Sequence, residues 1–344
     1  MTYVGYFFTA LLLSLGLNFL LSIFVFKNKS TELKRLGGSV VIFVFCLSAL
    51  NNKELVLTNS IQALIFGSLA ILIFGVFDDF KKFSWKLQLV FQLVLALFLV
   101  FSGFQIEYIS NPLGGIIDFS FWKWQLAGII IFPLGALLSV LWIIVCINAV
   151  NWADGLDGLA GGITLIGALS IFWISLYPHV NQPALAILAL ILVGSVAGFW
   201  ILNFPPAKII AGSSGSYFFG FMIAVLAILS GTKIATAMIA MTLPLVDFLA
   251  VIVTRKIDGR PIFLGEREDR HFHFILKKLG FSNWLILACY LGFLLLMFLT
   301  IVFFTQDRNE KIIWLGIEFI LALLIIVFAY RYKQKNIDQK GFFG

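Results

Sequence analysis

The sequence predicts an all-α polytopic membrane protein, a bundle of about eleven transmembrane helices. Of its 344 residues, 61% are hydrophobic and only 12% are charged. A soluble domain of this size could not bury so much apolar surface. Apolar runs of about 20 residues, the length that a bilayer-crossing helix needs, recur along the whole chain. We therefore interpret residues 1–344 as one integral membrane domain.

The apolar runs set the predicted helices. In order they are residues 4–26, 38–52, 58–77, 86–103, 125–147, 158–177, 182–202, 216–231, 234–254, 282–304 and 312–330. The runs at 38–52 and 216–231 are short for a full crossing, so ten crossings is the alternative count. Three cysteines, Cys46, Cys146 and Cys289, lie inside these runs and fit small core residues better than a disulfide or metal set.

Lysine and arginine give the predicted orientation. With eleven spans, nineteen of the 24 basic residues fall on the side of the C-terminus and five on the other side. Cytoplasmic loops carry the excess of Lys and Arg, so we expect the N-terminus outside and the C-terminus in the cytoplasm. The formal net charge of +7 is then mainly a topology signal and gives no reason to expect nucleic acid as a partner.

The polar clusters all fall on this predicted cytoplasmic side. They are residues 77–86, 148–158, 203–216 and 255–278. A transporter usually places buried charges near the middle of the membrane, in broken helices. Polar chemistry on one face instead favours an enzyme that works at that face, with the loop 255–281 contributing to its site.

The first cluster contains Asp78, Asp79 and Lys86. Adjacent helical residues differ by about 100°, so the two carboxylates cannot share one direction, and one is expected to orient a partner. On a continuous helix Asp79 and Lys86 lie two turns apart, about 10 Å along one stripe, and could grip a phosphate-containing substrate. The alternative is an interfacial charge pair whose lysines reach the lipid headgroups.

The second cluster, NAVNWADGLDG, places four polar side chains at a step of three: Asn148, Asn151, Asp154 and Asp157. On an unbroken helix this series drifts by roughly 60° per step. The glycines that follow each aspartate predict a break, so that the cluster wraps around a ligand. Its oxygens suit Mg²⁺, or a nucleobase or sugar. A hydrated loop with helix caps is the plainer alternative.

The last two clusters add candidate anion sites. AGSSGSYFFGF, at 211–221, is typical of a glycine-rich turn that opens a helix, whose N–H groups attract phosphate; Gly and Ser are also common where membrane helices touch. Arg267, Arg270, His271 and His273 fit a loop that holds a diphosphate by charge and hydrogen bonds. A zinc site would need a third ligand, and His179 falls on the opposite side.

These motifs together resemble one family. Five segments follow one another in the family's order: RLGG at 35–38, FGVFDDF with Lys86 and Gln92, NAVNWADGLDGLAGG, GFWILNFPPAKIIAGSSGSYFFG, and PLVDFLAVIVTRKIDGRPIF with RHFHF. The chain thus resembles the polyprenyl-phosphate N-acetylhexosamine-1-phosphate transferases, the superfamily that includes phospho-N-acetylmuramoyl-pentapeptide transferase. The match runs through most of the chain, and NAVNWADGLDGLAGG is its most specific part.

Two positions depart from the family pattern. Its G-D-x-G-S segment has Ser213 at the metal-binding aspartate, and the third histidine of its histidine motif is Phe274. A serine hydroxyl is a neutral and weaker Mg²⁺ ligand than a carboxylate. The ion would then need Asn151, another carboxylate or the substrate diphosphate.

The resemblance implies a role for each motif. Asp78 would deprotonate or orient an acceptor phosphate with support from Asp79, and Lys86 would contact phosphate. Asp154 and Asp157 would shape the nucleotide or sugar site. The metal would bind at Asn151 and Ser213, and the diphosphate would bind at Arg270, His271 and His273. Asn148 and Lys208 would make further contacts with substrate.

The implied reaction moves a sugar-1-phosphate from a UDP-sugar to polyprenyl phosphate and releases UMP. Mg²⁺, or Mn²⁺ in its place, would be the cofactor. The implied setting is the inner (plasma) membrane, with a cytoplasmic active site that begins a cell-envelope polysaccharide, and a homodimer is common among relatives. The rival interpretation, favoured by Ser213, is a non-catalytic binder of polyprenyl- or nucleotide-linked sugars; a generic transporter ranks third.

Overall fold

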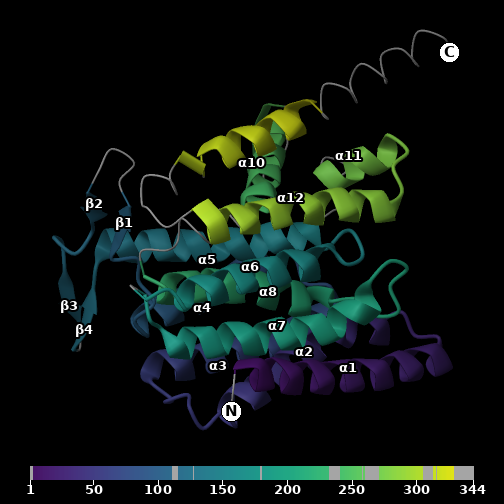
Figure 1. Ribbon diagram of the computed structural model, residues 1–344, viewed down its shortest axis with the longest axis horizontal. Coiled ribbons are helices and arrows are strands. Elements are labelled where there is room, and N and C mark those ends of the chain that lie inside the picture. The colour runs from purple at the N-terminus through teal and green to yellow at the C-terminus, as the bar shows by residue number, and fades with distance from the viewer. Residues whose placement is uncertain are drawn as a thin grey trace.

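A computed structural model describes residues 3–110, 115–126, 128–178, 180–231, 241–257, 259, 271–304, 313–314 and 316–328. The helices lie side by side in an elongated bundle, and two small β-hairpins project from one end (Figure 1). The helices are α1 (Tyr3–Asn28), α2 (Gly37–Leu50), α3 (Asn59–Lys81), α4 (Trp85–Phe101), α5 (Pro133–Ala153), α6 (Leu159–Ser175), α7 (Pro183–Asn203), α8 (Gly212–Leu229), α10 (Thr242–Ile257), α11 (Phe272–Lys278), α12 (Asn283–Phe304) and Gly316–Phe328, with a 3₁₀ turn at Leu33–Leu36.

The helices confirm a polytopic membrane bundle. Each of the eleven predicted runs overlaps a described helix, and seven of these helices are long and apolar enough to cross a membrane. The number of crossings and the orientation stay predictions. The start of the fifth run was wrong: Trp124–Leu126 and Ile129–Ile131 form strands, and α5 begins at Pro133. Proline is favoured in the first helical turn because its missing N–H would have no partner there.

The two hairpins were not expected from the sequence. β1 (Tyr108–Ser110) pairs with β2 (Ile116–Asp118), and β3 (Trp124–Leu126) pairs with β4 (Ile129–Ile131), both antiparallel. Gln105 ties the second hairpin to the bundle. Its Nε2 donates to the Ile130 carbonyl at 2.9 Å, and its Oε1 accepts from the Phe132 N–H at 2.8 Å. We call this end of the bundle the hairpin end, and the opposite end the site end.

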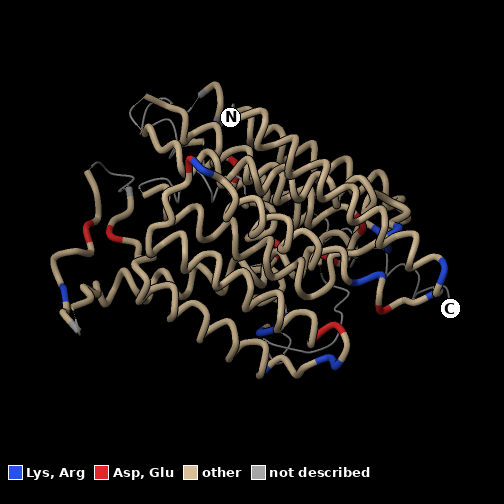
Figure 2. Tube along the Cα trace, turned by 90° about the horizontal axis from the view of Figure 1, so that it is seen from below, with Lys and Arg blue, Asp and Glu red and all other residues tan. Residues whose placement is uncertain are grey.

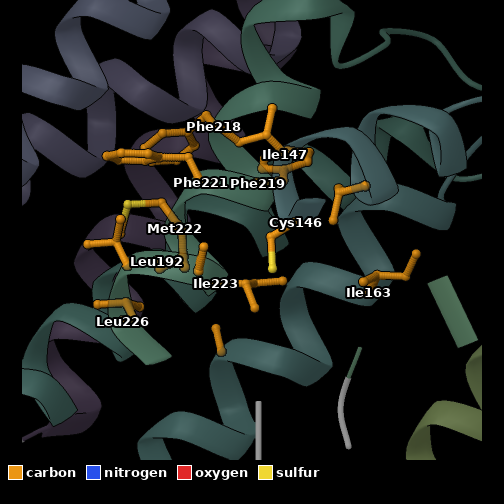
Figure 3. Close-up of a cluster of buried hydrophobic side chains, with 14 of the residues drawn as sticks. Cys146, Ile147, Ile163, Leu192, Phe218, Phe219, Phe221, Met222, Ile223 and Leu226 are labelled. Carbon is orange, nitrogen blue, oxygen red and sulfur yellow. The ribbon is translucent and has the colours of Figure 1, made fainter. Parts of the chain in front are cut away.

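Helix α8 forms the centre of the bundle. It packs against α2, α3, α5 and α6, and nearly every side chain from Gly212 to Ile228 is buried. Figure 3 shows Phe218, Phe219, Phe221 and Met222 of α8 facing side chains from α5, α6 and α7. An apolar helix buried on all sides fits the middle of a membrane bundle. The N-terminus of α8 is therefore held in place by the surrounding helices.

Glycines let two neighbours reach the start of α8. A side-chain carbon at Gly75 of α3 would overlap the backbone of Ser214, and one at Gly38 of α2 would overlap Gly215. The Gly38 N–H also donates to the Ala211 carbonyl at 3.1 Å. Because the backbones touch directly, the aspartates near the end of α3 come to lie beside the first turn of α8.

Charge separates the two ends of the bundle. Most described Lys and Arg residues gather at the site end, and few lie at the hairpin end (Figure 2). Lys123, which directly precedes β3, is one of these few. The molecule thus has the charge asymmetry from which we predicted its orientation.

Candidate functional site

The candidate site lies where four chain segments meet at the site end. These are the α3–α4 turn, the α5–α6 turn, the α7–α8 turn and the start of α11, which is bonded to Asp247 of α10 (Figure 1). Helices α5 and α6 are separated at Asp154–Gly158, and Gly158 has a φ of 81°. This confirms the predicted break, since glycine adopts positive φ at little cost.

Asp79 binds the N-terminus of α8. Its Oδ1 accepts from the Arg35 Nε at 2.8 Å and from the Ser213 N–H at 2.9 Å, and the carboxylate is buried. Gly212, with a φ of 67°, turns the chain so that the Ser213 N–H faces Asp79. The glycine-rich turn does open a helix, as predicted. However, the anion at its Ser213 N–H is a carboxylate of the same chain, so this N–H does not face a free phosphate.

Asp78 points another way and ends α3. Its Oδ1 accepts from the Phe83 N–H at 2.9 Å and from Gln88 Nε2 at 3.1 Å, and Lys82 adopts the left-handed conformation with a φ of 51°. The prediction that the two aspartates diverge is confirmed. The prediction that Asp79 and Lys86 share a helical stripe was wrong, because the chain turns between α3 and α4.

Lys86 lies in the first turn of α4 and is exposed. Its ammonium group is 5.8 Å from the centre of the Trp85 ring and pairs with no carboxylate among the described residues. An exposed ammonium at this end of the bundle can reach a lipid headgroup or a substrate phosphate.

The asparagines of the second cluster face α4 and α8. Asn148 Nδ2 donates to Gln92 Oε1 at 2.6 Å, and Asn151 Oδ1 accepts from Ser216 Oγ at 2.8 Å. Ser216 Oγ also lies 3.4 Å from the Ser213 carbonyl oxygen. Asn151 and Ser213, the two predicted metal ligands, are thereby brought into one neighbourhood by α5 and α8.

The aspartates of that cluster lie in the turn itself. Asp157 Oδ2 accepts from the Ala207 N–H at 3.1 Å, which joins the α5–α6 turn to the α7–α8 turn. Asp154 is the half-buried C-cap residue of α5. Lys208, in the α7–α8 turn, is exposed. The predicted catalytic and substrate contacts of these three side chains stay predictions.

The histidines border the α5–α6 turn from the side of α10. His271 Nδ1 lies 3.0 Å from Asp247 Oδ2, and the His271 and His273 rings stack with centres 5.7 Å apart. His273 packs against Gly155, and both of its ring nitrogens are buried without a hydrogen-bond partner in the part of the chain that the structure describes. Burial lowers the pKa of His273 to about 4. At neutral pH it is uncharged, so it could contact a diphosphate by a hydrogen bond but not by charge.

Some predicted residues cannot be placed. Arg267 and Arg270, and the rest of residues 260–270, lie outside the described residues, as does His179. The predicted roles of Arg267 and Arg270 in the loop 255–281 stay predictions.

Five residues of this region were not among our site candidates: Arg35, Gln92, Asn203, Ser216 and Asp247. Asn203 accepts from the Gly158 N–H at 3.0 Å and donates to the Ile209 carbonyl at 2.9 Å. Each is a polar or charged side chain beside or within an apolar run, and that placement was the available signal. Their partners are distant in the chain, so the sequence alone could not pair them.

The oxygen-rich cluster suits Mg²⁺ better than a metal that prefers nitrogen or sulfur. No group of three or more His, Cys, Asp or Glu side chains could hold a metal within the part of the chain that the structure describes. Asp79 Oδ2 is buried and has no hydrogen-bond partner among the described residues, and Asn151 and Ser213 supply neutral oxygens nearby. Mg²⁺ commonly uses one or two carboxylates and completes its shell with water and substrate phosphates. The residues present therefore fit Mg²⁺ with one carboxylate.

The fold and the site define a multi-pass membrane protein with a polar centre at one end of its bundle. Residues 61–231, about half of the chain, match the family model described as glycosyl transferase family 4. This span includes every site residue described above except Arg35, Asp247 and the two histidines.

Relatives match over most of the chain. A probable undecaprenyl-phosphate N-acetylglucosaminyl 1-phosphate transferase of Bacillus subtilis (strain 168) is 30% identical over 300 residues, which is 85% of this chain and 77% of that protein. A decaprenyl-phosphate N-acetylglucosaminephosphotransferase of Mycobacterium leprae is 28% identical, over 86% of this chain and 80% of its own. A phospho-N-acetylmuramoyl-pentapeptide-transferase of Sulfurimonas denitrificans is 29% identical, over 72% and 73%. The chain belongs to glycosyl transferase family 4 and is an enzyme of the glycosyl-1-phosphate transferase type.

Proposed function

We propose that the protein transfers N-acetylhexosamine-1-phosphate from a UDP-sugar to polyprenyl phosphate and releases UMP. The observation that supports this most directly is the meeting of four polar segments at one end of an apolar bundle. A lipid phosphate can reach that end while its chain stays among the apolar helices. The printed names of the Bacillus and Mycobacterium relatives describe transfer to polyprenyl phosphates.

The reaction needs positioning and charge neutralisation more than covalent help. An oxygen of the lipid phosphate attacks the β-phosphorus of the UDP-sugar. The bond from that phosphorus to the bridging oxygen breaks, and the electron pair leaves with UMP. Asp78 would orient the acceptor, and Lys86 and His271 would contact phosphate oxygens. Asp154 and Asp157 would border the nucleotide or sugar.

Mg²⁺ is the proposed cofactor, held by Asp79, Asn151 and the Ser213 hydroxyl together with the substrate phosphates. When bound, it would neutralise phosphate charge. Arg35 contributes a fixed positive charge to the same cluster through its bond to Asp79. We place the site on the cytoplasmic face of the plasma membrane, where UDP-sugars are made, as the first membrane step of an envelope polysaccharide.

A transfer assay tests this proposal. Purified protein is given labelled UDP-N-acetylglucosamine and undecaprenyl phosphate, with Mg²⁺ or with EDTA, and UMP and labelled lipid are measured. We expect Mg²⁺-dependent product, and a lower Mg²⁺ requirement for Ser213→Asp because a second carboxylate joins Asp79 beside the ion. Binding of UDP-sugars without UMP release from any of them, unrescued by Ser213→Asp, would establish the non-catalytic alternative.

A further inference from the structure

The carboxylate of Asp247 on α10 bonds two consecutive residues at the start of α11. Its Oδ2 lies 3.0 Å from His271 Nδ1, and its Oδ1 accepts from the Phe272 N–H at 2.8 Å. Both Asp247 and His271 are buried. A carboxylate can only accept at this distance, so the His271 Nδ1 carries the proton.

This bond leaves His271 Nε2 as the nitrogen available to a ligand. Nε2 has no hydrogen-bond partner among the described residues, and it is not enclosed as the two nitrogens of His273 are. A carboxylate on one imidazole nitrogen sets which nitrogen faces the ligand.

Aromatic contacts fix the ring on its other sides. Trp152 meets the His271 ring edge-on with centres 5.3 Å apart, and the Arg255 guanidinium lies 5.1 Å from the Trp152 ring centre. Trp152 follows Asn151 directly in α5. The ring of His271 therefore keeps a set position relative to Asn151, which accepts from Ser216 of α8.

We propose that Asp247 is a positioning residue, which holds His271 in the tautomer and direction that present Nε2 to the phosphates of the nucleotide sugar. The inference rests on the proposed function, because it assigns His271 to the same site. Asp247 does not touch substrate and acts through His271.

Asp247→Asn is the sharpest variant. The amide oxygen can still accept from the Phe272 N–H, so the start of α11 keeps one of its bonds. The amide NH₂ faces His271 Nδ1 as a donor and moves the ring proton to Nε2, which reverses the tautomer. Asp247→Glu retains a carboxylate and serves as the conservative variant.

A double-mutant cycle measures whether Asp247 acts through His271. The wild type, Asp247→Asn, His271→Gln and the double variant are compared by kcat/KM for transfer and by the Kd of labelled UDP-N-acetylglucosamine. We expect Asp247→Asn to lose roughly ten- to a hundredfold, Asp247→Glu to recover part of it, and the double variant to equal His271→Gln alone. The proposal would be overturned if the losses of the two single variants multiplied in the double variant. It would also be overturned if Asp247→Asn had the same kcat/KM and Kd as the wild type.

Glu318→Gln is the matched control. Glu318 is also a buried carboxylate bonded by one side chain, Thr300 Oγ1. Thr300 lies seventeen residues along α12 from its start, roughly 25 Å from the site end. The control should leave transfer unchanged. If the wild type binds the nucleotide sugar without transferring it, the proposed function fails, and the Kd values of the four proteins still test the role of Asp247. If the wild type neither binds nor transfers the sugar, both proposals fail.

Discussion

Asp79 connects three segments of the site through one oxygen atom. Arg35 and the Ser213 N–H both bind its Oδ1, while Oδ2 has no hydrogen-bond partner within the described ranges. An unpartnered carboxylate oxygen in a buried place is costly unless a proton, a cation or a ligand satisfies it. This cost supports the proposal that a cation binds beside Ser213 when substrate is present, since the serine itself brings no charge.

His273 gives a prediction about acid stability. Its pKa is lowered to about 4 by burial, from an ordinary value near 6.5. Below pH 6.5 the unfolded chain binds the proton more readily than the folded one, so the folded state loses stability as the pH falls from 6.5 towards 4. Between pH 7.5 and pH 5, this effect of His273 lowers the free energy of unfolding by about 2 kcal/mol. We expect the apparent Tm of the wild type to fall more steeply with acid than that of His273→Gln.

The comparison is made in one detergent, with Tm measured at half-unit steps of pH. Other acid-sensitive groups are present in both proteins, so they cancel in the difference between the two curves. Parallel curves for the wild type and His273→Gln would show that His273 is not held neutral by the fold.

At the scale of elements, the contact between α3 and α8 positions the aspartates. Gly75 lies against the backbone of Ser214, so Gly75→Ala places a methyl group where no space exists. We expect this variant to separate α3 from α8, to lower the apparent Tm, and to reduce transfer by more than tenfold through displacement of Asp79. Thermal unfolding and the transfer assay measure the two effects.

Gly16→Ala in α1 is the matched control for Gly75→Ala. Nothing lies within 4 Å of the position that its methyl group would take. Alanine is the better helix former, so the control is expected to keep activity and to be as stable as the wild type or more so. Equal behaviour of the two variants would show that the close approach of α3 and α8 does not control the site.

The helices were predictable because hydrophobic length and glycine placement are local signals. The apolar runs gave α1–α8 within a few residues except at α5, and the glycines after Asp154 and Asp157 marked the break between α5 and α6. The second hairpin was missed because its strands, Trp124–Leu126 and Ile129–Ile131, are apolar enough to extend the following helical run. Composition alone does not distinguish short apolar strands from helix.

The partners of the site residues were not predictable in the same way. Arg35 and Asp79 are 44 residues apart, and Asn151 and Ser216 are 65 apart. Such pairs follow from how the helices pack, which hydrophobic periodicity does not encode. The αL turn at Lys82, which moved Lys86 off the expected stripe, came from a lysine, a residue type that rarely adopts this conformation.

At the scale of the whole molecule, the two ends of the bundle must face different compartments for the proposed chemistry to work. UDP-sugars are cytoplasmic, so the site end must face inwards and the hairpins outwards. The excess of described Lys and Arg at the site end agrees with this orientation. Lys27 and Lys123 are exposed and lie at opposite ends, which makes them suitable reporter positions.

We therefore predict the labelling pattern of two single-cysteine proteins. The background replaces Cys46, Cys146 and Cys289 with serine or alanine and must keep transfer activity. In intact cells, or in spheroplasts where an outer membrane is present, a membrane-impermeant maleimide should label Lys123→Cys at once and Lys27→Cys only after permeabilisation. Because both positions are exposed, failure to label cannot be explained by burial. The reverse pattern would place the site end outside, away from its nucleotide substrate, and would be incompatible with both the charge argument and the proposed reaction.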